Sequence, residues 1–470
     1  MLCSVYLTHH FYFDSFFLST NVFFFHKSIL LGVDLLSQAQ EKVRLLEQRV
    51  YASDAIRRKL HNKVQELRGN VRVAVRVRPL LGNEPESEDP SLRASGGAIK
   101  VDDVCGEETD SMELSIVSGA GAGKKMSFDK VFGQSCDQKN VFKEVSELVQ
   151  SALDGYNVCI FAYGQTGSGK TFTMQGGNTD ESRGIIPRSI AQILESSQAM
   201  NADGWEFNIK ASFLEIYNEE IVDLLSPHQP MKKSMQKKGG SMSFGDNKKK
   251  KSNSDRPKLV VRQMDTGMSI EGLEEIELKD FSQLNSIMGR AEKNRSVSAT
   301  AMNSESSRSH CAFILHITGT NVKRNKTVEG CLNLVDLAGS ERLKRSGATG
   351  AAAKETAAIN KSLSALVDVF DAISKKRSHV PFRNSKLTYL MQSCLSGNGK
   401  TMMIVNVSPT TASGGETLCS LRFAKQVNQT ELGRAKKNSG SSSSSSSSGS
   451  VAKRRGTGIP GGRDSKRQRR

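Results

Sequence analysis

A glycine-rich loop at residues 164–171 constrains the fold of this chain more than any other feature. The loop reads GQTGSGKT and fits the pattern G-x-x-x-x-G-K-[ST] at every position. A short apolar run at residues 158–163 precedes it and a helix-compatible stretch follows it. This is the strand–loop–helix context of a phosphate-binding loop, whose backbone N–H groups curl around phosphates. We therefore predict such a site in an α/β protein, formed by Gly164, Gln165, Thr166, Gly167, Ser168, Gly169, Lys170 and Thr171.

Further segments predict the rest of an α/β fold. Residues 71–77 alternate valine with arginine or alanine, which is the period of a half-buried strand. Residues 331–335 and 402–405 are almost continuously apolar, as in strands that are covered on both faces. One face of a long helix is marked by Ile359, Leu363, Leu366, Phe370 and Ile373. Together these segments predict a central mixed β-sheet flanked by helices on both faces.

An N-terminal helix is predicted over residues 36–69. Apolar residues recur at three–four spacing from Leu36 to Leu67, Ser53 and Arg57 interrupt them, and Gly69 supplies a stop signal. An imperfect coiled-coil seam and an amphipathic helix packed on the neighbouring domain both fit this pattern. Residues 1–35 are rich in phenylalanine, but their apolar run is shorter than the roughly 18 residues that a membrane span needs. We interpret this segment of uncertain origin as a mispredicted first exon or a truncated upstream sequence rather than a membrane anchor.

The net charge of +17 indicates a polyanionic partner, and nucleic acid, an anionic membrane and an acidic protein surface all qualify. The 8 cysteines form no C-x-x-C pair, which indicates free thiols in a reducing cytosol or nucleus.

Residues 227–256 are lysine-rich with little apolar content and predict a mobile basic insertion. The Ser/Gly-rich residues 434–470 predict a disordered basic tail.

Two later segments carry groups that a nucleotide-hydrolysing site needs beside the phosphate-binding loop. Lys170 can reach the β and γ phosphates, and the Thr171 hydroxyl can ligate Mg²⁺. Asp336 ends the strand at 331–335 and would approach that Mg²⁺ through water, while Gly339 lets an amide approach the γ-phosphate. The segment NSESSRSH at 303–310 suits metal ligation, water positioning and an ion pair, although a polar surface loop fits its composition too. Its candidate residues are Asn303, Ser306, Ser307 and Arg308.

Taken in order, these segments resemble the kinesin superfamily. The segment at 303–310 resembles kinesin switch I, and DLAGSE at 336–341 resembles switch II. RVRP at 76–79 is similar to the adenine-side motif of the family, HVPFRNSKLT at 379–388 to its microtubule-facing segment, and LRFA at 421–424 to its last helix. The resemblance covers residues 70–433 and implies the kinesin motor fold of P-loop NTPases. No N-K-x-D motif that reads guanine is present, so we expect ATP to be the nucleotide.

The resemblance implies a role for each matching residue. Arg78 and Pro79, in the motif that begins at Arg76, would bracket adenine against Phe172. Ser307 and Thr171 would hold Mg²⁺, with Asp336 acting through water. Arg308 and Glu341 would form an ion pair that closes the site and helps order the attacking water. Gly339 would report loss of the γ-phosphate to the following loop and to a long helix beginning near residue 360. The implied activity is microtubule-stimulated ATP hydrolysis.

The N-terminal position of the helix is similar to the neck of the C-terminal-motor kinesins (kinesin-14), which move toward microtubule minus ends. This similarity implies a minus-end-directed motor and a homodimer formed through the neck. It departs from the subfamily upstream, where a long stalk and tail would be expected. Two other readings stay open at this point: a microtubule crosslinker or anchor with weak or non-processive motor activity, and a nucleic-acid-dependent ATPase.

The resemblance also gives the positive charge a target, because microtubule surfaces are strongly acidic. The basic residues that it places near tubulin are Lys344, Arg345, Lys375, Lys376, Arg377, Arg383 and Lys386. The basic clusters at 453–455 and 466–470 fit a bipartite nuclear-localisation signal that importin would read, and they fit a tether to microtubules or nucleic acid equally well. We expect the cytoplasm and the microtubule cytoskeleton, including the spindle, with the nucleus as an alternative, and no membrane partner.

Overall fold

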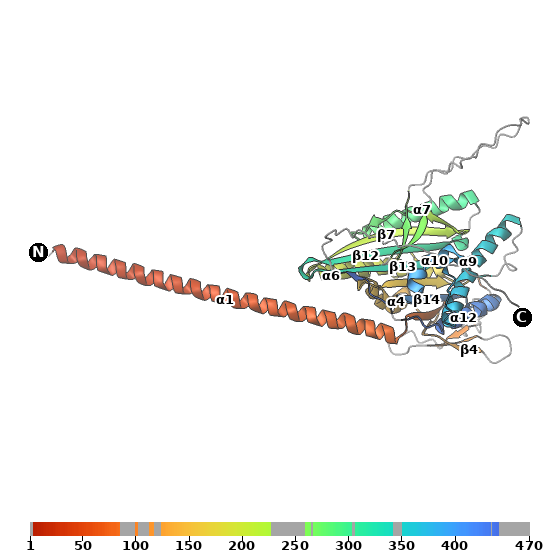
Figure 1. Cartoon of the computed structure of the whole chain (residues 1–470), viewed down its shortest axis with the longest axis horizontal. Coiled ribbons are helices and arrows are strands. Elements are labelled where there is room, and N and C mark those ends of the chain that lie inside the picture. Colours follow the sequence, from red (N-terminus) through yellow and green to blue (C-terminus); the bar gives the residue numbers. More distant parts are fainter. Residues whose placement is uncertain are drawn as a thin grey trace, which may run out of the picture.

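The computed structural model describes residues 3–84, 99–101, 112–116, 124–226, 259–264, 267–302, 306–341, 350–433 and 435–440. A long helix, α1 (Cys3–Leu67), projects away from an α/β domain that holds most of the remaining elements (Figure 1). Within the described residues, no helix combines the length and apolar character needed to cross a membrane.

The domain is built around one mixed sheet. Its spatial order is β11-β7-β12-β13-β6-β14-β1-β5, and the pairs from β13 through to β5 are parallel while the others on this path are antiparallel. The prediction of a central mixed sheet is therefore confirmed. In that order the strands are β11 (Ile276–Glu277), β7 (Trp205–Tyr217), β12 (His310–Asn321), β13 (Lys326–Asp336), β6 (Asn157–Tyr163), β14 (Gly399–Val407), β1 (Val71–Val77) and β5 (Lys130–Phe132).

Helices cover both faces of the sheet, as predicted. One face packs against α4 (Gln138–Leu153), α6 (Ile185–Asn201) and α7 (Ser282–Met302), and the other packs against α9 (Gly350–Ser374) and α12 (Gly414–Asn428). Helix α4 shows why: its apolar residues Val141, Val145, Leu148 and Ala152 share one buried face. Asp137 caps the start of this helix, because its side chain accepts a hydrogen bond from the N–H of Asn140.

Shorter elements complete the fold. The helices are α5 (Lys170–Met174), α10 (Lys386–Leu390) and α11 (Gln392–Leu395), with 3₁₀ turns η1 (Ser306–Arg308), η2 (Val322–Arg324), η3 (Phe382–Asn384) and η4 (Thr411–Ser413). Strand β8 (Glu220–Asp223) pairs with β7. Two small sheets stand apart, formed by β9 (Val260–Met264) with β10 (Gly267–Glu271), and by β2 (Ile99–Val101), β3 (Glu113–Ile116) and β4 (Lys124–Ser127).

Strand β1 differs from its prediction, because it is buried on both faces rather than one. Arg72 and Arg76 are only 5% and 7% exposed. Arg72 donates to Gln65 of α1, and Arg76 donates to Gln138 of α4 at 2.8 Å. The alternation is real, but the face that carries the arginines is covered by helices instead of solvent.

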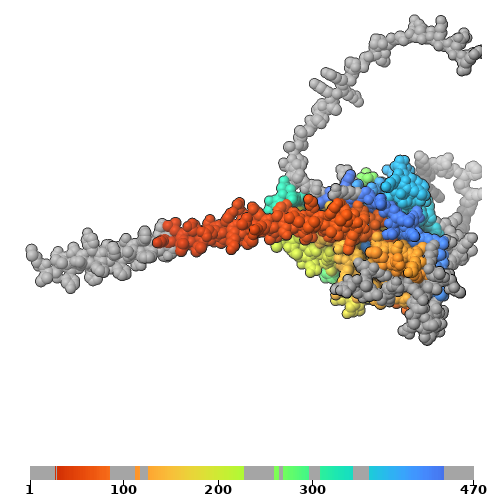
Figure 2. All heavy atoms as spheres, turned by 90° about the horizontal axis from the view of Figure 1, so that it is seen from below, coloured from red at the N-terminus to blue at the C-terminus, as the bar shows by residue number. Residues whose placement is uncertain are grey.

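Helix α1 runs without a break across the expected boundary at residues 35 and 36. Its last turns lie against the domain (Figure 2), where the Arg58 guanidinium approaches Asp154 at 3.6 Å and Gln65 donates to Glu147 at 2.6 Å. The apolar stripe that the sequence marks points elsewhere, and Leu67 is 76% exposed. The contact with the domain is thus made by the polar face of this helix. The end of the helix does pack on the domain, but through polar side chains rather than through the apolar stripe, and the coiled-coil seam stays a prediction.

The end of the fold also differs from expectation. Residues 439–440 form strand β15 (Ser439–Gly440), which pairs with β13, and Ala435 is buried. The N–H of Asn438 donates to the carbonyl of Gly155 at 2.9 Å. The prediction of disorder from residue 434 is therefore wrong for residues 435–440, because backbone pairing with β13 orders a segment with almost no apolar side chains. The predicted insertion at 227–256 and residues 441–470 lie outside the described residues.

Candidate nucleotide-binding site

The glycine-rich loop leaves the end of β6 and enters α5, in the middle of the sheet. Gly164 follows the last strand residue with φ of 150°. A Cβ atom at this position would lie 2.1 Å from the backbone oxygen of Asn406 on β14, so only glycine fits. The loop is thereby pressed against the carboxyl end of the neighbouring parallel strand, which is where α/β proteins place ligands.

Lys170, the first residue of α5, is folded back into its own loop. Its Nζ donates to the carbonyl oxygens of Gly164 at 2.9 Å and Gln165 at 3.0 Å. Burial lowers the pKa of this lysine, while Asp336 and Glu341 act in the opposite direction. Within the described part of the chain the hydrogen bonds of this buried ammonium go to neutral carbonyls. Phosphate oxygens can supply the opposite charge that it lacks there.

Asp336, at the end of β13, meets the loop from the other side. The Thr171 hydroxyl donates to its Oδ2 at 2.7 Å, and its Oδ1 is buried and finds no hydrogen-bond partner among the residues that the structure describes. Burial raises the pKa of Asp336, against the lowering effects of the Thr171 hydrogen bond and of Lys170. A hydroxyl oxygen beside an unpartnered carboxylate oxygen is the hard donor set that Mg²⁺ prefers, so these residues fit the expected metal.

Backbone hydrogen bonds join the segments that resemble switch I and switch II to each other and to the loop. The N–H of Gly339 donates to the carbonyl of Ser307 at 2.8 Å, and the N–H of Ser340 donates to the carbonyl of Gly164 at 3.1 Å. The carboxylate of Glu341 accepts from the backbone N–H of Thr166 at 2.9 Å and from its hydroxyl at 2.5 Å. Of the residues that the sequence singled out in these segments, Ser307, Gly339 and Glu341 are therefore brought together beside the loop.

Gly339 has no space for a side chain between these segments. A Cβ atom on this residue would lie 2.3 Å from Oε2 of Glu341 and 2.4 Å from Oγ1 of Thr166. The predicted ion pair between Arg308 and Glu341 stays a prediction. Asn303 lies outside the described residues, and Ser306 is placed in η1 by its backbone alone.

His310 is a residue of this site that the sequence interpretation did not single out. Its Nδ1 accepts a hydrogen bond from the N–H of Ala338 at 3.0 Å, and its Nε2 lies 2.6 Å from Oγ of Ser362 on α9. Burial lowers the pKa of His310 to about 3, so the ring is neutral and Nε2 carries the proton that Ser362 accepts. Its place inside the switch I-like motif was the available signal, but the partners on α9 and on the strand exit were not visible in sequence.

A cavity of about 260 Å³ continues from the loop toward the residues expected to hold adenine. Arg76, Arg78, Pro79 and Phe172 all line it, together with Ser168 and Gly169 of the loop. Phe172 is 48% exposed, and the Arg76 guanidinium carbon lies 5.6 Å from the centre of its ring. Burial lowers the pKa of Arg76 to about 10.

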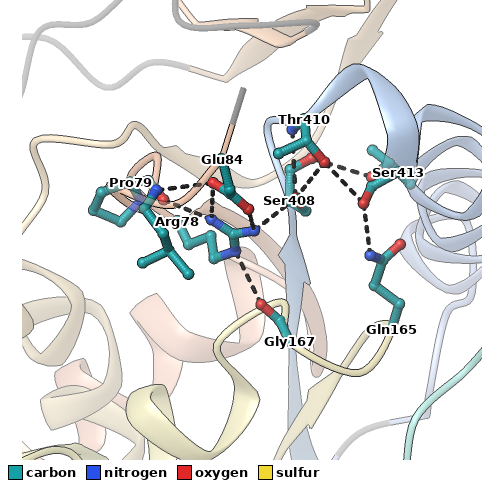
Figure 3. A network of polar contacts seen from close by, with 10 residues as sticks. Arg78, Pro79, Glu84, Gln165, Gly167, Ser408, Thr410 and Ser413 are labelled. Carbon is teal, nitrogen blue, oxygen red and sulfur yellow. Dashed lines mark hydrogen bonds and ion pairs between the residues drawn. The ribbon is translucent and has the colours of Figure 1, made fainter. Parts of the chain in front are cut away.

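Arg78 sits at the rim of this cavity, in a network of polar contacts (Figure 3). Its Nε donates to the carbonyl of Gly167 at 2.9 Å, and its NH2 group donates to the hydroxyl of Ser408 at 3.0 Å. Glu84 accepts from both terminal nitrogens of the guanidinium. Arg78 therefore ties the phosphate-binding loop to the ends of β1 and β14.

The basic residues expected to face tubulin gather away from this cavity, around the carboxyl end of α9. Lys375 and Arg377 both pair with Asp371, at 2.7 and 2.8 Å, and Lys376 lies 4.0 Å from Glu431. Arg383 in η3 and Lys386 in α10 belong to elements that pack on α9. Lys344 and Arg345 lie outside the described residues.

The loop, the aspartate at the end of a neighbouring strand and the lysine enclosed by carbonyls define a P-loop nucleotide-binding protein. A family model of the kinesin motor domain matches residues 76–430, and the chain belongs to this family. The predicted resemblance, including that to the C-terminal-motor subfamily, is confirmed by the relatives and by the solved structures that the chain matches.

Among the relatives, the Kinesin-like protein KIN-14D of Arabidopsis thaliana is 46% identical over 400 residues, which cover 85% of this chain and 48% of that protein. Carboxy-terminal kinesin 2 of Xenopus laevis is 44% identical over 391 residues, covering 83% of this chain and 57% of that protein. The chain thus spans about half the length of the curated relatives that it matches.

Solved kinesin structures share the fold. The C-terminal motor and motor homology domain of Kar3Vik1, fused to a synthetic heterodimeric coiled coil, aligns with a TM-score of 0.71 and 38% identity, over 87% of this chain and 98% of that one. The motor domain of Kar3 from Saccharomyces cerevisiae aligns with a TM-score of 0.60 and 40% identity, over 77% of this chain and 100% of that one.

Proposed function

We propose that this chain is a microtubule-dependent motor that couples ATP binding and hydrolysis to force or movement, directed toward the microtubule minus end. The observation that carries the proposal is the junction at Gly339, where the phosphate-binding loop and both switch-like segments meet through backbone hydrogen bonds. A γ-phosphate bound there would compete for these contacts, so its arrival and loss would change how the segments pack.

The residues of the site divide the work of hydrolysis. Lys170 would leave the carbonyls of Gly164 and Gln165 to hold the β and γ phosphates. Thr171 and Ser307 would hold Mg²⁺, with Asp336 behind Thr171, and the bound metal would neutralise charge that develops on the phosphate oxygens. Glu341 would give up its hydrogen bonds with Thr166 and form an ion pair with Arg308. This ion pair would close the site over the attacking water.

His310 supports a route from this site to the microtubule-facing surface. It joins the strand exit at Ala338 to Ser362 in the middle of α9. Helix α9 ends at Ser374, directly before the basic cluster of Lys375 and Arg377. A change in packing at Gly339 would therefore shift helix α9 as a rigid body. The far end of this helix precedes the basic residues that we expect to contact tubulin.

The neck supports the proposed direction and a homodimer. Helix α1 enters the domain at the start of β1, as in the resemblance to the C-terminal motors, and Asn70 donates to the carbonyl of Gly433 at 2.6 Å. The apolar stripe of the helix, including Val43, Leu46 and Leu60, is exposed and would be covered by a second copy. Because Ser53 and Arg57 interrupt it, a crosslinker or anchor with weak or non-processive activity is the alternative.

Two assays test these proposals together. Purified chain is fixed to a surface and presented with polarity-marked microtubules and ATP, and ATP turnover is measured with microtubules, with DNA and with neither. We expect microtubule-stimulated turnover and gliding that shows minus-end-directed motion. Turnover without gliding would support the anchor, stimulation by DNA alone would remove the motor proposal, and Lys170→Ala serves as the inactive control.

We also propose a cytoskeletal location on microtubules, with the basic tail acting either as a signal for importin or as an electrostatic tether. A reporter fused to residues 439–470 separates these alternatives. Accumulation in the nucleus would support the importin signal, whereas decoration of microtubules would support the tether.

A further inference from the structure

The guanidinium of Arg78 has an acceptor for every hydrogen that it can donate. A guanidinium carries five N–H donors in a fixed plane. Here Nε donates to Gly167, NH1 donates to the carbonyl of Pro79 at 2.8 Å and to Glu84 at 2.9 Å, and NH2 donates to Glu84 and to Ser408. The side chain is also largely enclosed, with 14% of its surface exposed.

This arrangement limits what Arg78 can offer a nucleotide. Phosphates belong at the loop residues 164–171, and the cavity beside this loop is lined by Arg78, Pro79 and Phe172, so we expect the base to lie against these three residues. With all of its donors occupied, Arg78 can present a flat face and an apolar stem to the base, but it has no hydrogen left for the edge of the base.

The edge of the base is where purines differ. Guanine presents O6 and N7, both acceptors, and arginine with free donors recognises this pair well. Adenine presents N7 beside an amino group, which is itself a donor and is a poor neighbour for a guanidinium with free hydrogens. Whether Arg78 has free donors therefore influences which purine the cavity favours.

Glu84 is the partner that decides this, because its carboxylate occupies a hydrogen on each terminal nitrogen. Its own position is fixed by the N–H of Leu81, which donates to Oε2 at 2.8 Å. The hydrogen bonds from Arg78 lower the pKa of this carboxyl against the effect of burial, so Glu84 stays ionised at neutral pH. Glu84 reaches Arg78 from a loop outside the cavity, since it does not line the cavity itself.

We propose that Glu84 is a specificity-determining residue. By occupying the donors of Arg78 it prevents this side chain from hydrogen-bonding the edge of guanine, and so maintains the preference for ATP over GTP. The proposal rests on the proposed function, because it takes ATP as the substrate. Glu84 acts through Arg78 and is a positioning residue, while Ser408 assists it by occupying one further hydrogen of the same guanidinium.

The test compares purine selectivity in the full chain. Dissociation constants for ATP and GTP are measured by competition against a fluorescent ADP analogue, for the wild type and for Glu84→Gln, Ser408→Ala and Glu113→Gln. The last variant is the matched control, because Glu113 pairs with Lys125 on the surface strands β3 and β4, at 3.9 Å and outside the cavity. Thermal melting of each variant reports whether it folds.

We expect the ratio of the GTP constant to the ATP constant to fall about tenfold in Glu84→Gln, the value of one hydrogen bond to a charged donor. It should fall less in Ser408→Ala and stay at the wild-type value in Glu113→Gln. An unchanged ratio in folded Glu84→Gln, or equal weakening of the binding of both nucleotides, would overturn the proposal. If Glu84→Gln does not fold, the ratio measured for Ser408→Ala takes its place, and an unchanged ratio there would overturn the proposal. A wild type that binds neither nucleotide would instead remove the proposed function.

Discussion

Lys400 on β14 is a cation buried in the domain, and its removal has a consequence that depends on pH. The residue is 1% exposed, its Nζ donates to Oγ of Ser151 at 3.0 Å, and it lies 4.2 Å from the centre of the Tyr156 ring. Burial lowers the pKa of Lys400 from 10.5 to about 8, although the nearby Asp154 acts to raise it. We expect Lys400→Met, which keeps the apolar stem and removes the charge, to change the pH dependence of stability.

The sign follows from proton binding in the two states. Below about pH 8 the lysine is charged in both the folded and the unfolded chain, and the folded state carries the full cost of burying it. Between about pH 8 and 10.5 the unfolded chain binds more protons, so the stability of the wild type rises with pH. The lowering of the pKa from 10.5 to about 8 corresponds to about 3 kcal/mol, of which about 2 kcal/mol is recovered by about pH 9.5.

The assay is urea unfolding of the wild type and Lys400→Met at about pH 7 and about pH 9.5. The free energy of unfolding of the variant minus that of the wild type should fall by about 2 kcal/mol between these values. Lys139→Met, which removes an exposed lysine of α4, should show no such change. A difference that stays constant with pH would refute the reasoning, whatever its size at neutral pH.

Three further changes test the site and the neck. Gly339→Ala places a methyl group 2.4 Å from Oγ1 of Thr166, so we expect ATP turnover to fall by about a hundredfold or more with normal circular dichroism; near-normal turnover would contradict the close packing. His310→Ala should lower microtubule stimulation more than basal turnover, and between about pH 5.5 and 8 the wild-type rate should show no titration from this residue, because its pKa is about 3. Arg58→Ala removes a guanidinium whose central carbon lies 5.2 Å from the Trp205 ring, and we expect faster hydrogen exchange in the last turns of α1; unchanged exchange would mean that other contacts hold the neck.

The phosphate-binding loop and the strands around it could be predicted because their information is local. The loop pattern, the apolar run before it and the aspartate after residues 331–335 are each a few residues long, and they depend on backbone chemistry that any sequence with this spacing would share. The order of these segments then allowed a mixed sheet covered on both faces to be expected. The structure extends the strands by a few residues and begins the long helix at Gly350, ahead of the expected position near residue 360.

The remaining features depend on partners that are distant in the chain. Alternation in β1 predicts one solvent-exposed face, but Arg76 donates a hydrogen bond to Gln138 on α4, which lies 62 positions later in the chain. His310 takes its role from Ser362, and the order of β15 comes from backbone pairing with β13, to which side-chain composition gives no guide. In each case tertiary packing determines the environment of the residue, and these contacts cannot be read from a single sequence without the fold.

The short joint between α1 and β1 has a mechanical consequence. Three residues, Arg68, Gly69 and Asn70, separate the last residue of a 65-residue helix from the first residue of a central strand. At about 1.5 Å per residue the helix is about 97 Å long, so a tilt of roughly 10° at Gly69 would swing its far end through about 17 Å. The joint therefore converts ångström-sized shifts in the sheet into nanometre-sized displacements at the far end of α1.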